Sequence, residues 1–230
     1  MSFYISKSIL DVASRTRLGV VELAGCEVGY GHTSLDDMRL RVVSRVRRDI
    51  RGAAALKSVP QIAGFDQLRS FFEGEIRRQS TRAERLLEGI LQGEPMPVEN
   101  DAEDTCTLLM LFYKLPVILV DPTALRGDIG LALGRPGSSL EIVESRESLS
   151  TDGKLVFADD LGEFTSPYAQ GKRGLVTERS QNLLLIGVFP ENVGDSIVKD
   201  FIRRSSNWMV SLCGGEVVQE GMVGEAEAGQ

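Results

Sequence analysis

The residue types best suited to nucleophilic catalysis or metal binding in this chain are one histidine and three cysteines. His32 lies in a glycine-rich loop, so any nucleophile that needs histidine as its base would depend on this residue alone. A lone loop histidine is more often an exposed polar residue. Cys26, Cys106 and Cys213 are far apart and have no neighbouring histidine. This spacing predicts buried, reduced thiols and no metal site.

Two groups of charged residues in the second half of the chain are the next candidates. Asp159 and Asp160 come at the end of a predicted strand, where one carboxylate caps the following turn and the other faces solvent. Lys172, Arg173 and Arg179 flank the sequence GLVTE. This cluster could contact phosphate or balance nearby acidic loops, and spacing alone leaves both roles open.

Residues 35–52 predict an arginine-rich amphipathic helix, with Thr33 or Ser34 as its N-cap. Apolar residues recur there at four-residue spacing from Met38 to Ile50 and form a buried stripe. A second face carries arginines that could bind phosphate: Arg41, Arg45 and Arg48. The charge pattern by itself favours a solvated face whose arginines pair with the helix's own aspartates.

Composition and missing motifs exclude several functional classes. The sequence contains no GxxxxGK[ST] loop, no GxGxxG after a strand, no HExxH and no GxSxG, so we expect no nucleotide or other cofactor and no metal. The net charge of −7 works against non-specific binding to a polyanion, so RNA binding would need a local basic patch. No apolar run approaches the roughly 18 residues of a membrane span, and the N-terminus does not resemble a secretory signal. We therefore expect a cytoplasmic protein.

The predicted elements that position these residues are helices in the first half and mainly strands in the second. The predicted helices are 35–52, 65–78, 80–92, 105–113 and 195–212, and the predicted strands are 18–24, 115–121, 131–134, 139–145, 154–160 and 182–189. This order favours an α+β fold with mixed sheets and packed helices. With 42% hydrophobic residues, 1–218 should form a single domain, and the acidic tail 219–230 should be disordered.

Several short motifs occur in the order and at the intervals of a known family. Residues 97–120 resemble its Pro-x-x-Asn-x-x-x-Asp segment through Asn100 and Asp104, with Pro116 and Asp121 at matching spacing. The motifs LRGDIGLALG, GKLVFADDLG, VTERSQNLLLI and LCGGEV follow in order. Together they resemble, over about residues 17–217, free-standing relatives of the B3/B4 domain. That domain is the tRNA-editing domain of the phenylalanyl-tRNA synthetase beta subunit.

The resemblance implies a B3/B4-like fold that binds the 3′ end of a mischarged tRNA and hydrolyses its aminoacyl ester. Such hydrolysis needs an oriented water and hydrogen-bond donors for the oxyanion, but no covalent nucleophile. Candidate catalytic residues are then Asp121, Asp160 and Lys172. Candidate binding residues are Asn100, Asp104, Gly127, Asp128, Thr177 and Glu178. Candidate tRNA contacts are Arg41, Arg45, Arg48, Arg173 and Arg179.

The sequence departs from the family pattern at two polar positions. Ile118 stands where the synthetase domain typically has histidine, and Gln170, Gly171 and Lys172 stand where it has Gly-Gly-Glu. The chain could therefore be a trans-acting editing protein, or a non-catalytic module that binds tRNA or an amino-acid-like ligand. A protein-interaction domain with an unused pocket is a third alternative.

Overall fold

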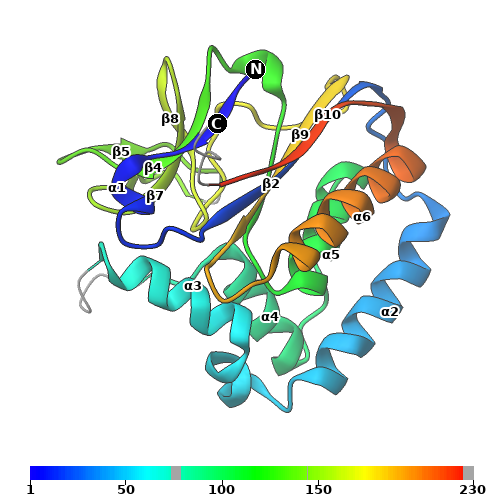
Figure 1. Ribbon diagram of the computed structural model, residues 1–230. Coiled ribbons are helices and arrows are strands. Elements are labelled where there is room, and N and C mark those ends of the chain that lie inside the picture. Colours follow the sequence, from blue (N-terminus) through cyan, green and yellow to red (C-terminus); the bar gives the residue numbers. More distant parts are fainter. Residues whose placement is uncertain (74–78, 144, 225–230) are drawn as a thin grey trace.

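The computed structural model describes residues 1–73, 79–143 and 145–224 (Figure 1). Its helices are α1 (Lys7–Leu10), α2 (Thr33–Asp49), α3 (Pro60–Ser70), α4 (Arg82–Gln92), α5 (Asp101–Tyr113) and α6 (Asp195–Cys213), with 3-10 turns η1 (Ala53–Ser58) and η3 (Pro122–Ala124). Its strands are β1 (Phe3–Ile5), β2 (Arg17–Cys26), β3 (Val117–Val120), β4 (Ile129–Leu133), β5 (Ser139–Leu140), β6 (Leu149–Ser150), β7 (Leu155–Asp159), β8 (Gly162–Thr165), β9 (Asn182–Phe189) and β10 (Gly214–Val223).

The strands of the described residues form two four-stranded sheets and a small two-stranded one. One sheet has the order β10-β2-β9-β3 and is antiparallel throughout. The other has the order β1-β4-β7-β8 and is mixed, because β1 runs parallel to β4. The small sheet pairs β5 with β6. The expected α+β class with mixed sheets and packed helices is confirmed.

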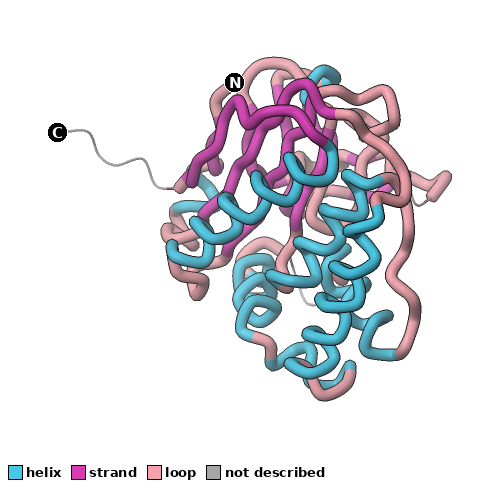
Figure 2. Tube along the Cα trace, turned by 90° about the vertical axis from the view of Figure 1, so that its right-hand side faces the viewer, coloured by secondary structure: helices cyan, strands magenta, loops and turns pink. Residues whose placement is uncertain are grey.

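Three strands of the antiparallel sheet, β2, β9 and β3, form a central layer that is buried on both faces, whereas the edge strand β10 is mostly exposed. Along β9, Leu183 and Leu185 belong to the core shared with the helices, whereas Leu184 and Ile186 belong to the core shared with the mixed sheet. This alternation follows from the two-residue period of a strand, and it explains why β9 reads as an unbroken apolar run. Figure 2 shows most of the helices gathered on one side of the strands.

A glycine pair lets α6 approach the central sheet closely. Gly19 of β2 and Gly187 of β9 are register partners. A Cβ atom on either glycine would lie 2.8 Å from the ring of Phe201, which α6 contributes and which is fully buried. The missing side chains therefore leave the space that this ring fills.

The helix boundaries differ from the predicted ones because the actual caps lie elsewhere. α2 is capped by the imidazole of His32, whose Nδ1 accepts a hydrogen bond from the Ser34 amide at 3.2 Å. This is a structural role for the only histidine in the sequence. α5 begins four residues earlier than predicted, at Asp101 rather than 105. α3 spans Pro60–Ser70 rather than 65–78, and residues 74–78 lie outside the described part of the chain.

The expectation of a disordered tail is wrong for residues 219–223. They continue β10 and pair with β2, from Gln219 opposite Glu22 to Val223 opposite Leu18. The domain end that the sequence predicted at 218 therefore falls inside a strand. An acidic, small-residue composition suggests disorder, but backbone pairing with an existing sheet edge does not depend on side-chain type. Residues 225–230 lie outside the described residues.

The N-cap of α4 should contribute measurably to the free energy of unfolding. This helix begins at Arg82 rather than at the predicted residue 80, and Thr81 caps it: the Thr81 Oγ1 accepts from the Glu84 amide at 3.1 Å, and Glu84 Oε2 accepts from the Thr81 amide at 2.7 Å. Thr81→Ala should lower the free energy of unfolding by about 1 kcal/mol in a urea titration. Ser80→Ala is the matched control and should change it by less than about 0.5 kcal/mol. Equal effects of the two substitutions would contradict this assignment.

Candidate functional site

A cavity of about 590 Å³ lies where α4, the segment 94–100, the first turn of α5 and the segment 170–176 meet. This volume is in the range of small-molecule binding sites. The polar part of its wall includes Arg82, Arg85, Asn100, Glu103 and Gln170. The apolar part includes Leu86, Ile90, Leu175 and Val176. The cavity thus offers charged groups of both signs beside an apolar surface.

Glu103 is the central acidic group of this wall. It is only 1% exposed, and its Oε1 accepts a hydrogen bond from Gln170 Nε2 at 2.6 Å. Its Oε2 accepts from Arg82 Nη2 at 3.4 Å. Burial raises the pKa of Glu103, although the positive charge of Arg82 opposes this effect. A carboxylate with a raised pKa in a cleft is suited to accept a proton at neutral pH.

Asn100 joins two parts of the cavity wall. As the N-cap of α5, its Oδ1 accepts from the Glu103 amide at 2.9 Å. Its Nδ2 donates to the Val176 carbonyl at 3.5 Å. The side chain therefore sets the position of the first turn of α5, from which Glu103 projects, against the segment 175–177.

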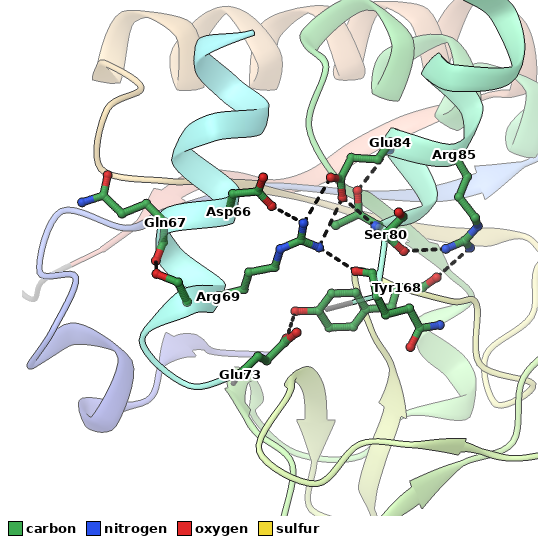
Figure 3. A network of polar contacts seen from close by, with 11 residues as sticks. Asp66, Gln67, Arg69, Glu73, Ser80, Glu84, Arg85 and Tyr168 are labelled. Carbon is green, nitrogen blue, oxygen red and sulfur yellow. Dashed lines mark hydrogen bonds and ion pairs between the residues drawn. The ribbon is translucent and has the colours of Figure 1, made fainter. Parts of the chain in front are cut away.

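Arg85 connects α4 to the segment 166–170. Its guanidinium donates to the Ser80 carbonyl at 2.6 Å and to the Tyr168 carbonyl at 2.7 Å (Figure 3). Nearby, the Arg82 amide donates to the Pro167 carbonyl at 3.0 Å. These bonds hold the two cavity arginines in place relative to Gln170.

A buried polar network supports this segment from the side of α3 (Figure 3). Tyr168 is fully buried, and its hydroxyl donates to Glu73. Arg69 bonds to Asp66, to the Gln79 carbonyl at 2.6 Å and to Glu84 at 3.2 Å. Burial raises the pKa of Tyr168 well above its usual value, so the phenol stays a neutral donor. The network fixes Tyr168 and, with it, the segment that carries Gln170.

The predicted catalytic residues are not among the residues that line this cavity. Asp121 caps η3, where its Oδ1 accepts from Thr123 N at 3.0 Å and from Thr123 Oγ1 at 2.6 Å. Asp160 is exposed and lies against Gly127. Lys172 is exposed and pairs with Glu141 at 3.7 Å. The structure therefore does not bring these three predicted groups together with Glu103.

Of the predicted binding residues, Asn100 alone lines the cavity. Asp104 is buried behind it, where it pairs with Arg39 of α2 and accepts from the Glu99 amide at 2.9 Å. Burial raises the pKa of Asp104, and these hydrogen bonds act in the opposite direction. Asp104 therefore joins α5 to α2, a structural role.

The other predicted binding residues lie in loops outside the cavity wall. Gly127 has a φ of 75°, and a Cβ at this position would clash with the Asp160 carboxylate, so a side chain is excluded. Asp128 is exposed and accepts from the Ser2 amide at 3.2 Å. The Thr177 amide donates to Ser180 Oγ at 3.1 Å, and Glu178 accepts from the Tyr30 hydroxyl at 3.0 Å. The last contact brings the loop before α2 next to the segment that lines the cavity.

The arginines of α2 are largely engaged with acids of the same helix. Arg45 and Arg48 both lie near Asp49, at 3.4 and 3.5 Å, and Arg45 also lies over the ring of Phe112. Arg41 is exposed. These contacts agree with the paired, solvated face that the charge pattern favours, and α2 supplies no residue to the cavity wall.

Arg173 and Arg179, two basic residues of the cluster in the second half of the chain, have different surroundings. The Arg173 guanidinium forms a bidentate ion pair with the Asp159 carboxylate, with N–O distances of 2.6 and 2.8 Å, and also donates to the Gly162 carbonyl. Its charge is therefore matched within the fold. Arg179 is exposed and remains a predicted tRNA contact. The turn that the sequence predicted at the acidic pair is confirmed, because Asp159 accepts from the Leu161 amide while Asp160 faces solvent.

The sequence interpretation missed Arg82, Arg85 and Glu103. The helical spacing of the sequence places the two arginines on the polar face of α4. Glu103 is an acidic residue in the first turn of α5, where acidic residues are common. Neither pattern signals burial. Gln170 was noted only because it stands at a position where the family has another residue.

All three cysteines are buried and unpaired, as predicted. Within 1–73, 79–143 and 145–224, no three His, Cys, Asp or Glu side chains are grouped as a metal site would require. In the same part of the chain, none of the helices has the length and apolar character to cross a membrane.

Comparison with known proteins gives three findings. No family model matches the chain. A Bacillus subtilis (strain 168) protein, the uncharacterized protein YhzB, is 25% identical over 151 residues, which cover 66% of this chain and 64% of YhzB. An N-terminal fragment of the phenylalanyl-tRNA synthetase beta subunit from Pyrococcus horikoshii matches 96% of this chain and 50% of its own length, with 10% identity and a TM-score of 0.43. The chain thus spans half the length of that fragment.

Proposed function

We propose that the cavity binds the aminoacylated 3′ end of a tRNA and hydrolyses the ester that holds a wrong amino acid. The observation that carries the proposal is the buried carboxylate of Glu103 in the cavity wall, held by Gln170 and Arg82. An oriented carboxylate of raised pKa is what general-base activation of water requires.

The wall of the cavity matches the parts of an aminoacyl ester. The α-ammonium group would be attracted by the acidic residues Glu99 and Glu103. The amino-acid side chain would pack on the apolar part of the wall, near Leu86 and Ile90. The guanidinium groups of Arg82 and Arg85 lie in the same wall and would neutralise a phosphate or the developing oxyanion.

The proposed reaction is attack of water on the ester carbonyl. The Glu103 carboxylate takes a proton from the water while the oxygen forms a bond to the carbonyl carbon. The tetrahedral intermediate carries its negative charge on the former carbonyl oxygen, where the cavity arginines stabilise it. The bond between this carbon and the ribose oxygen then breaks, and the ribose oxygen takes the proton from Glu103. The products are the free amino acid and the uncharged tRNA.

The sequence resemblance to the B3/B4 domain supports the same substrate. The two positions at which this chain departs from the family pattern support a different set of catalytic groups. Ile118, at the position where the synthetase domain typically has histidine, borders a space of about 10 Å³ together with Arg82 and Gln170. The position is thus next to the polar part of the cavity but holds an apolar side chain. Glu103 would supply the base in place of a histidine.

The test is hydrolysis of a panel of correctly charged and mischarged tRNAs, including tyrosyl-tRNA of the phenylalanine acceptor. Selective hydrolysis by the wild-type protein, unchanged by Lys172→Ala, is expected, because Lys172 lies outside the cavity and pairs with Glu141. Loss of hydrolysis with Lys172→Ala would instead support the site that the sequence alone suggested. No hydrolysis of any charged tRNA would contradict the proposal.

A second candidate is a module that binds the same ligand without turnover. Both carboxylate oxygens of Glu103 already accept hydrogen bonds, and this would limit their contact with water. Such a module would bind charged tRNA in a salt-sensitive way and release no amino acid. The same panel, read out by filter binding as well as by hydrolysis, separates the two candidates.

A further inference from the structure

Tyr30 presents an aromatic ring to solvent from the glycine-rich loop before α2. The residue is 67% exposed, and its hydroxyl donates to Glu178 Oε2 at 3.0 Å. Gly31 follows with a φ of 71°, which favours glycine over other residues. The hydroxyl is tethered, so the ring is held in one orientation although most of its surface is free.

The loop that carries Tyr30 is fastened beside the cavity. The Asp101 amide donates to the Gly29 carbonyl at 2.9 Å, and Asp101 Oδ1 accepts from the His32 amide at 3.0 Å. Asp101 directly follows Asn100, which lines the cavity, and Glu178 comes two residues after Val176, which also lines it. Both anchors of the Tyr30 loop therefore adjoin the cavity wall.

Other exposed apolar side chains belong to the cavity wall or adjoin it in sequence. Leu175 and Val143 line the cavity and are 39% and 44% exposed. Val98 is 67% exposed and stands between Pro97 and Glu99, both of which line it. Exposed apolar groups that gather at a polar cavity indicate a ligand part with a flat or apolar face outside it.

We propose that Tyr30 is a stacking platform for the terminal adenine base of the tRNA 3′ end; this inference rests on the proposed function. When the aminoacyl group enters the cavity, the nucleoside attached to it must lie at the opening. An exposed ring held in one orientation can stack on a base without losing much conformational freedom. Glu178 would accept a hydrogen bond from the adenine amino group or a ribose hydroxyl.

The experiment compares two non-hydrolysable probes by calorimetry. One is a 3′-aminoacylamino-3′-deoxyadenosine, and the other is the amide of the same amino acid without the nucleoside. The wild-type protein is expected to bind the adenosine probe about tenfold more tightly, and Tyr30→Ala should remove most of this difference. Tyr30→Phe keeps the ring but loses its bond to Glu178, and should retain part of it. Tyr4→Ala, which removes another exposed tyrosine (44%), should retain all of it.

Each outcome has a distinct meaning. If the wild-type protein binds neither probe, the proposed function itself fails. If it binds both probes equally, or if Tyr30→Ala weakens both by the same factor, the stacking role is overturned while amino-acid binding stands. Loss confined to the adenosine probe in Tyr30→Ala, with Tyr30→Phe between Tyr30→Ala and wild type, supports the platform.

Discussion

Replacing Glu103 with glutamine is expected to lower the rate of ester hydrolysis by about 100-fold or more, because the water loses its general base. The substitution keeps the shape of the side chain, and binding of the non-hydrolysable adenosine probe should persist. Glu88→Gln, on the exposed face of α4, is the matched control and should leave the rate unchanged. Single-turnover deacylation measures the rate, and calorimetry measures the binding.

The pH profile provides an independent check on Glu103. The base must be ionised, and burial raises its pKa above the usual 4.5. Hydrolysis by the wild-type protein should therefore rise with pH through this elevated pKa and then level off. Residual activity of Glu103→Gln should lack this step. An unchanged rate or an unchanged profile in the variant would exclude Glu103 as the base.

Replacing Asp159 with asparagine should have the largest effect on stability. The carboxylate is fully buried and accepts two bonds from Arg173, one from the Arg126 amide at 2.7 Å and one from the Leu161 amide at 3.0 Å. Removing its charge takes the carboxylate away from the Arg173 guanidinium, which keeps only its bond to the Gly162 carbonyl and its contact with the Phe164 ring. At neutral pH, the free energy of unfolding should fall by about 2–3 kcal/mol in a urea titration, because the Arg173 side chain is partly exposed and solvent screens part of the loss.

The pH dependence of this effect has a definite sign. Burial tends to raise the pKa of Asp159, but the hydrogen bonds from Arg173 and from the Arg126 amide outweigh it and lower the pKa below 3.8. The stabilisation is therefore present above pH 3.8 and is lost as the pH falls through the lower, folded-state pKa. The difference between wild type and variant should shrink in that acidic range.

Asp160→Asn is the control for this prediction, because Asp160 is the adjacent residue and is exposed. Its effect should stay within about 0.5 kcal/mol at every pH tested. If Asp159→Asn cost no more than this control, or if its cost did not diminish in acid, the ion pair with Arg173 would not be the source of the stability.

Local patterns in the sequence were enough to predict the fold class and most of the elements. The short, unbroken apolar run of β9 is typical of a buried strand, and the four-residue spacing of α2 and the apolar stripe of α6 reflect the period of a helix with one buried face. The turn at Asp159 was also predictable from the sequence, because a side chain that caps its own turn involves only neighbouring residues.

The cavity and its polar groups depend on contacts that no local pattern contains. Glu103 and Gln170 are far apart in the chain and meet only because α5 and the segment 166–170 pack together. Arg82 and Arg173 look alike as surface arginines, yet one enters the cavity wall and the other is matched by Asp159. The sequence by itself therefore establishes most of the helices and strands, but not β10, whose last residues it predicted as a disordered tail. The packing of those segments establishes which charges are buried, and burial is what shifts a pKa and creates a site.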